Sequence, residues 1–256
     1  MMRKMKCVIS YDGTNYSGYQ IQPNAVTIQE TIEQALAKMH SGKMIRIHSS
    51  GRTDKGVHAI GQVIHFQTDL QIPPKNWKKA LNTLLPDDIY IKQVQEVAEN
   101  FHARIDAVEK EYRYFVLNKQ EPDVFRRNYV HFETESLNLK KIQSACKLFE
   151  GTHDFTAFSS ARSTVKGSKV RTLFEVSCQR RSDSELVFIL KGDGFLYHMV
   201  RIIVGVLIDV GKGHVNEAEI KKMFESRDRT QVGVTLPPQG LYLWHVTYEN
   251  TEMDDE

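Results

Sequence analysis

The chain has 256 residues, of which 41% are hydrophobic and 26% charged, and its formal net charge is +2. This composition is typical of a folded globular protein and excludes a long disordered or low-complexity chain. The length allows one large domain or two halves that share a cleft. The most apolar window, 195–210, is interrupted by charged residues and is too short to span a bilayer, so we expect no membrane segment.

Cysteine usage and the first residues both favour the cytoplasm. The three cysteines are widely spaced and form no C-x-x-C pair, so neither a disulfide framework nor a zinc site is indicated. Residues 1–6 are basic but precede a short alternating segment rather than the apolar core of a signal peptide.

The positive charge is unevenly distributed. Residues 249–256 carry five acidic side chains, so the body before them has a net charge of +7. The excess gathers in an acid-free, serine-rich segment that holds Arg162, Lys166, Lys169 and Arg171. A flexible basic loop of this kind suits a phosphate backbone, and it suits a solvated surface loop equally well.

In the first half, alternating residues predict a strand over 5–11, followed by a loop of turn-forming and aromatic residues over 12–19. Thr27 and Glu30 form a capping-box pattern before a helix that Gly42 is placed to end. Strands at 45–48 and 62–67 flank a loop with two glycines, and a helix near 77–84 and a strand over 89–97 complete the half.

The second half repeats this order of elements. We predict a strand over 111–117, a helix ending at Phe149, strands over 170–179 and 185–191, a helix over 195–209, a helix opening at Asn216 and a strand over 241–248. The order is that of the split β-α-β-β-α-β unit. The sequence therefore predicts an α+β fold of two ferredoxin-like halves, residues 1–105 and 106–248. We expect them side by side in an extended, mainly antiparallel sheet with a central active-site cleft, and an acidic tail over 249–256.

Asp54 is the main candidate for a reactive group. It lies in Gly51-Arg52-Thr53-Asp54-Lys55-Gly56, where the glycines allow sharp turns that could present a short carboxylate from a rigid sheet edge. An isolated G-x-x-D-x-G is more often a surface turn, so the surrounding residues must decide. His48, His58 and His65 match no standard metal spacing and are better explained as core or loop residues.

Two other segments carry polar groups among apolar ones. Arg201 lies in the apolar run after Phe195 and needs an anion, which a structural ion pair with Asp209 or Glu219 would also supply. Tyr112 and Tyr114 share one face of their strand, where aromatic rings are usually core but can stack on bases when basic residues lie nearby.

Taken together, the motifs resemble the TruA family of tRNA pseudouridine synthases. They follow the family's order over nearly the whole chain: Tyr11-Asp12-Gly13-Thr14, Gly51-Arg52-Thr53-Asp54-Lys55-Gly56-Val57-His58-Ala59, Phe101-His102-Ala103-Arg104, Tyr112-Arg113-Tyr114, His198-Met199-Val200-Arg201 and Gly240-Leu241-Tyr242-Leu243. Lys55 and the acidic tail depart from the pattern without touching the positions expected to react.

The resemblance implies isomerisation of uridine to pseudouridine at positions 38, 39 and 40 of the tRNA anticodon stem-loop, without a cofactor or a metal. It implies that Asp54 is the catalytic aspartate, Arg201 its basic partner, and Tyr112 the ring that packs on the base and takes the C5 proton. Leu241 would line the pocket, and Arg52 would help displace the uridine from its stack. The remaining candidate substrate contacts are His58, Arg162, Lys166 and Lys169. A cytoplasmic homodimer that binds one tRNA across both subunits is also implied.

Two alternatives remain open. The chain could be a non-catalytic tRNA-binding or folding module on the same scaffold, in which case Asp54 would be dispensable. A carboxylate-dependent nucleoside hydrolase would release free uracil, but such enzymes use a spaced pair of carboxylates, whereas one candidate marks this loop.

Overall fold

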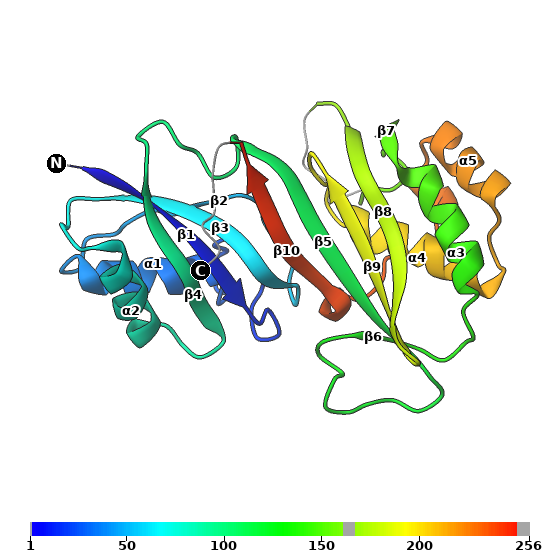
Figure 1. Ribbon diagram of the computed structural model, residues 1–256, viewed down its shortest axis with the longest axis horizontal. Coiled ribbons are helices and arrows are strands. Elements are labelled where there is room, and N and C mark those ends of the chain that lie inside the picture. Colours follow the sequence, from blue (N-terminus) through cyan, green and yellow to red (C-terminus); the bar gives the residue numbers. More distant parts are fainter. Residues whose placement is uncertain (1, 161–166, 250–256) are drawn as a thin grey trace. The chain divides into compact units, whose positions relative to one another are not determined.

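The computed structural model describes residues 2–160 and 167–249 (Figure 1). The chain folds into two compact units: unit 1 comprises 1–108 and 243–256, and unit 2 comprises 109–242. Both units combine helices with mainly antiparallel strands, so the predicted α+β class is confirmed. None of the helices in the described ranges is long and apolar enough to span a membrane.

Unit 1 has the predicted order of strands and helices. Its elements are β1 (Arg3–Tyr11), α1 (Ile28–Met39), β2 (His48–Ser49), β3 (His58–Thr68), α2 (Pro74–Leu84) and β4 (Ile89–Val97). The sheet runs β4-β1-β3 and continues with the last six residues of β10 (Leu241–Tyr248), while β2 pairs with β3.

The core of unit 1 follows from the alternation in β1. Met5, Cys7 and Ile9 point to one face and are completely buried. Phe66 of β3 contributes to the same core, because its ring meets the Trp77 ring of α2 edge-on with centroids 5.3 Å apart. This burial fixes the sheet against its helices and provides a rigid base for the loop between β2 and β3.

Unit 2 has the predicted elements as far as the helix that opens at Asn216 and adds short elements, whereas the closing strand predicted over 241–248 is β10, most of which groups with unit 1. Unit 2 contains β5 (Ala107–Asn118), whose first two residues group with unit 1, β6 (His131–Glu133), α3 (Leu139–Cys146), η1 (Lys147–Phe149), β7 (Gly151–Asp154), β8 (Val170–Ser182), β9 (Glu185–Gly192), α4 (Met199–Lys212), α5 (Glu217–Ser226), η2 (Arg229–Gln231) and η3 (Pro238–Gly240). The strand order is β5-β9-β8-β7, and β6 pairs with β5 in parallel. Sequence reasoning missed β6 and β7.

The helix predicted from Phe195 begins four residues later, at Met199. The backbone of His198 is left-handed, with φ +64, so His198 precedes the helix instead of lying on its surface with Arg201. Helix α4 is otherwise almost wholly buried. Gly211 lets it approach α3 closely, since a Cβ at that position would lie 2.7 Å from Cδ1 of Ile142.

Candidate active site

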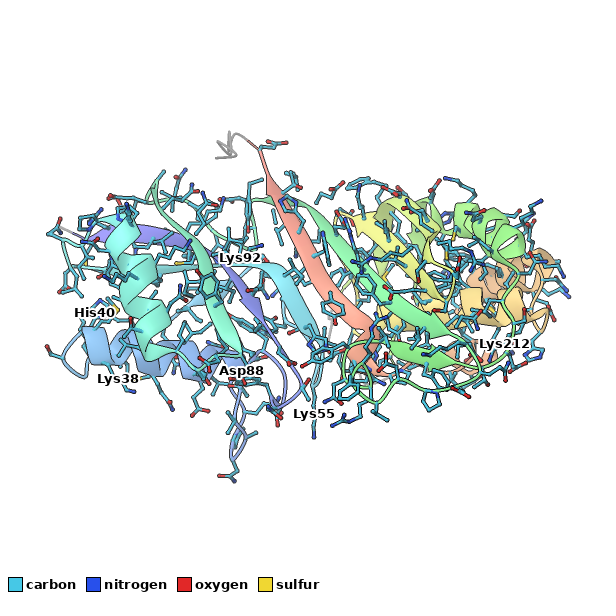
Figure 2. The ribbon with its side chains drawn as sticks, turned by 60° about the horizontal axis from the view of Figure 1, so that its bottom comes forward. Lys38, His40, Lys55, Asp88, Lys92 and Lys212 are labelled. Atoms are coloured by element: carbon cyan, nitrogen blue, oxygen red, sulfur yellow. The ribbon has the colours of Figure 1, made fainter. Side chains whose placement is uncertain are left out.

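Asp54 lies in unit 1, on the loop that joins β2 to β3. Asp54 is half-buried, whereas the preceding Thr53 is buried and the following Lys55 is exposed. Figure 2 labels Lys55. Arg52, the expected base-displacing residue, is exposed. The loop that carries Asp54 thus leads directly into β3, and the role of its carboxylate stays a prediction.

Hydrogen bonds on both sides of Asp54 hold the loop in place. The hydroxyl oxygens of Tyr11 and Thr53 lie 2.7 Å apart, and the amide of Tyr19 donates to the Thr53 carbonyl at 3.0 Å. The amide of Val57 donates to the Asp54 carbonyl at 3.1 Å and closes a turn in which Gly56 has φ +76. Of the two loop glycines, Gly56 supplies the left-handed backbone, while Gly51 is not among the described glycines with positive φ.

The 12–19 loop packs directly against the Asp54 loop, and its glycines make this approach possible. A Cβ on Gly13 would lie 2.0 Å from the Val57 carbonyl oxygen. A Cβ on Gly18 would lie 3.0 Å from the Thr53 carbonyl oxygen, and Gly18 has φ +99. The first predicted loop thus forms the support on which the carboxylate loop rests.

His58, a candidate substrate contact, is only 2% exposed at the far end of the loop. Its Nδ1 lies 3.1 Å from the Gly13 amide nitrogen and 3.1 Å from Oδ1 of Asp12. In the neutral ring Nδ1 can accept from that amide, and the same Asp12 oxygen already accepts from the Thr14 amide at 2.9 Å. Nδ1 of His58 thus contacts the 12–19 loop at two atoms and ties the two loops together. A contact between His58 and substrate stays a prediction.

Unit 2 contributes the remaining candidates, with Tyr112 on β5. Tyr112 is 8% exposed, and its ring meets Phe195 edge-on with centroids 4.9 Å apart. Tyr114, two residues along the same face, is completely buried, and its hydroxyl donates to the Pro237 carbonyl at 2.8 Å. Tyr114 is thus a core residue, whereas Tyr112 keeps part of its surface accessible.

Arg201 lies in the first turn of α4 and is half-buried. Its Nε donates to the Leu236 carbonyl at 2.6 Å, next to the carbonyl that Tyr114 holds. The chain then passes through η3 to Leu241, which is 5% exposed. Arg201 and Tyr114 therefore hold the backbone at Leu236 and Pro237, which leads through η3 to Leu241.

The protonation of Tyr114 is consistent with its hydrogen bond to the Pro237 carbonyl. Burial raises the pKa of Tyr114 far above its usual range, and the positive charge of Arg201 opposes the rise only partly. The phenol therefore stays protonated and can donate its hydrogen bond at any physiological pH. Glu219, one proposed ion-pair partner of Arg201, instead accepts from the Asn216 amide at 2.7 Å in the predicted capping box of α5.

Of the three candidates on the basic loop, Lys169 lies among the described residues. Lys169 is half-buried, and its carbonyl accepts from the Phe155 amide at 3.1 Å. Arg162 and Lys166 lie outside the described residues.

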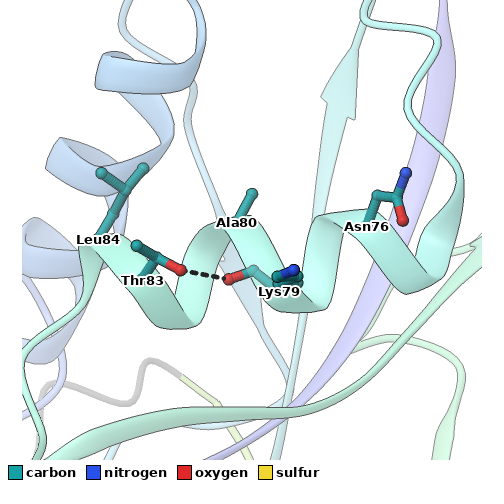
Figure 3. A pocket seen from close by; sticks show the side chains of 5 residues that line it. All are labelled: Asn76, Lys79, Ala80, Thr83 and Leu84. Atoms are coloured by element: carbon teal, nitrogen blue, oxygen red, sulfur yellow. Dashed lines mark hydrogen bonds between the residues drawn. The ribbon is translucent and has the colours of Figure 1, made fainter.

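The hollow in Figure 3 belongs to unit 1. It runs along α2 and is lined by Asn76, Lys79, Ala80, Thr83 and Leu84, with almost entirely apolar walls. It contains none of the candidate site residues. Within the ranges 2–160 and 167–249, no three His, Cys, Asp or Glu side chains are grouped so that they could hold a metal ion.

The family model described as "tRNA pseudouridine synthase" matches residues 7–106 and 145–249. A relative named "tRNA pseudouridine synthase A" from Oceanobacillus iheyensis is 57% identical over 97% of this chain and 98% of its own length. Another with the same name, from Bacillus subtilis (strain 168), is 50% identical over 96% of this chain and 100% of its own. The protein therefore belongs to the tRNA pseudouridine synthase family, whose enzymes isomerise uridine in tRNA, and the expected membership is confirmed.

Structural likeness adds little to this assignment. The solved structure described as "Crystal Structure of a Cbf5-Nop10-Gar1 Complex" aligns with 79% of this chain and 54% of its own at 14% identity. Its TM-score is 0.34, too low to support an argument.

Sequence reasoning missed the residues that support Asp54. Tyr11 and Gly13 appeared only within a family motif, and Gly18 only within the 12–19 loop, yet each lies against the Asp54 loop. Gln62 was used only to mark the start of a strand. A polar residue amid the apolar run of β3 was the available signal, since a buried amide needs partners for its donor and its acceptor.

Proposed function

We propose that this enzyme converts uridine to pseudouridine at positions 38, 39 and 40 of the tRNA anticodon stem-loop, with Asp54 as its catalytic carboxylate and without a cofactor. The reaction breaks the bond from N1 to C1′ and forms one from C5 to C1′. The C5 proton is lost and N1 gains one, so the isomerisation is redox-neutral. A positioned carboxylate and a proton acceptor suffice for this chemistry.

Each candidate has a role in this scheme. Asp54 either attacks the substrate or removes a ribose proton, and both routes need the ionised form. Arg201 is the cation that favours that form, because a nearby guanidinium lowers the pKa of a carboxyl group by about 1–3 units. Tyr112 packs on the base and accepts the C5 proton, while Leu241 lines the pocket.

Arg52 assists extrusion of the base, and the basic loop with Arg162, Lys166 and Lys169 binds phosphate. Extruding a base costs a few kcal/mol, and stacking on one aromatic ring returns about 1–3 kcal/mol. The family resemblance also implies a cytoplasmic homodimer that holds one tRNA across both subunits. Light scattering of the enzyme with and without tRNA would test that stoichiometry.

The observation that supports the proposal most strongly is the way Asp54 is held. A half-buried carboxylate lies between an anchored Thr53 and a glycine turn, on a loop buttressed by a second glycine loop. An ordinary surface turn needs no such support. Support of this kind suits a reacting side chain, because the position of such a group must be held to within a fraction of an ångström.

The test uses anticodon stem-loop transcripts that each carry a single uridine, at position 38, 39, 40 or an adjacent position. We expect pseudouridine at 38, 39 and 40, with a metal chelator present and no cofactor added. Product only at other positions, or a requirement for an added cofactor, would contradict the proposal. Release of free uracil would identify a hydrolase, and binding without product would identify a non-catalytic module.

A further inference from the structure

Gln62 is a fully buried polar residue on β3 whose amide contacts the start of the Asp54 loop. Its Nε2 donates to the Gly51 carbonyl at 2.8 Å. Its Oε1 accepts from the Ser50 hydroxyl at 2.6 Å and from the Val63 amide at 3.2 Å. Both ends of the amide are thus used, and two of the three bonds go to the residues that open the loop.

The backbone reinforces this clamp. Ser50 is also fully buried, and its amide donates to the Val63 carbonyl at 2.8 Å. The start of the loop is therefore held by two neighbouring residues of β3, through the side chain of Gln62 and the backbone of Val63.

We infer that Gln62 is a positioning residue for Asp54: its buried amide fixes the path of the loop and thereby the direction in which the carboxylate points. The inference rests on the proposed catalytic role of Asp54. The inferred role goes beyond stability, because two of the three bonded partners, Ser50 and Gly51, lie on the loop that carries the reacting group.

The simplest alternative is that the amide merely satisfies buried polar groups. Thr68 is a matched control for that alternative. It lies on the same strand, is 1% exposed, and its hydroxyl bonds the His40 ring at 2.8 Å, but it does not touch the loop. Gln62→Leu and Thr68→Val each remove a buried polar group and leave its partners unpaired, so both should lower the midpoint of urea unfolding.

Turnover should separate the two variants. We expect Gln62→Leu to lower kcat on an anticodon stem-loop substrate by roughly 10- to 100-fold with little change in KM, because a misplaced reacting group slows chemistry more than binding. Thr68→Val should keep kcat within about twofold. Equal kcat values in both variants, or a change in KM alone, would overturn the inference.

Gln62→Glu provides a second readout that does not depend on comparing stabilities. An ionised glutamate cannot donate to the Gly51 carbonyl, whereas the protonated acid can, and burial raises its pKa. The kcat of Gln62→Glu relative to the wild type should therefore rise as the pH is lowered from 8 to 6. A flat or falling ratio would contradict the assigned role.

Asp54→Asn, assayed in parallel, distinguishes a failure of the proposed function from a failure of the positioning role of Gln62. Wild-type turnover by that variant would refute the proposed function. An inactive Asp54→Asn beside a fully active Gln62→Leu would refute the positioning role alone.

Discussion

Replacing Gly18 by alanine should slow turnover through contact with the Asp54 loop, over and above its effect on stability. Gly18 has φ +99, and a side chain in the left-handed region costs about 1–2 kcal/mol. The new Cβ would lie 3.0 Å from the Thr53 carbonyl oxygen, 3.2 Å from the Lys55 amide nitrogen and 3.3 Å from the Asp54 carbonyl carbon. All three are backbone atoms of the loop, so the loop must move.

The size of the effect follows from these distances. Restoring an ordinary 3.4 Å contact to the Thr53 oxygen requires a shift of roughly 0.4 Å. If a 1 Å misplacement costs about 100-fold in rate, this shift costs roughly sixfold in kcat. The unfolding free energy should fall by about 1–2 kcal/mol as well, from the backbone strain.

Gly42→Ala is the matched control. Gly42 has φ +91, but a Cβ there would meet no atom within 4 Å. Both variants should lose similar stability in urea titrations, while single-turnover pseudouridine formation should slow only in Gly18→Ala. Equal turnover in the two variants would refute the claim that the 12–19 loop positions Asp54.

Three further predictions address binding, chemistry and stability. Tyr112→Phe should leave tRNA affinity nearly intact in filter binding while stopping product formation; a large loss of affinity would make the hydroxyl a binding contact. Neutralising Lys166 and Lys169 together should reduce the slope of log affinity against log salt by up to about 0.9 per lost phosphate contact, and an unchanged slope would contradict phosphate binding by this loop. Burial, aided by neighbouring positive charge, lowers the pKa of His65 to about 4, below the unfolded value of about 6.5. Its contribution to stability is therefore complete above pH 6.5 and is lost as the pH falls towards 4. His65→Asn, which keeps an acceptor for the Ala103 amide, should flatten the dependence of unfolding free energy on pH in that window, and an unchanged slope would contradict the assignment.

Local patterns predicted most elements because their signals are local. The strand predicted over 89–97 is observed as β4 over Ile89–Val97, following the turn that Pro86 opens. The capping box at Asn216 begins α5 as expected. In both places neighbouring residues supply the hydrogen bonds or the period that defines the element.

The failures have tertiary causes. The strand predicted over 45–48 is reduced to β2 because a side chain takes its backbone donor: the Ile47 amide donates to Glu33 Oε1 at 3.1 Å. The sequence analysis also placed residues 243–248 in the second half, 106–248. They group with unit 1, where the backbone of Trp244 passes so close to Gly61 that a Cβ on the glycine would lie 2.4 Å from its carbonyl oxygen.

The candidate site also has one part that the sequence predicts and another that it does not. The loop and its carboxylate could be predicted, because glycines, an aspartate and their spacing are visible in the chain. The support by Gly18 and Gln62 could not, since it depends on contacts between residues distant in sequence or across a strand pair.

The most direct test of the central claim compares Asp54→Asn with the wild type on a stem-loop labelled with tritium at C5 of the target uridine. Conversion to pseudouridine releases that label to water. We expect the variant to bind the RNA with affinity near that of the wild type and to release no tritium above background. Tritium release near the wild-type rate would show that the carboxylate of Asp54 is not the catalytic group.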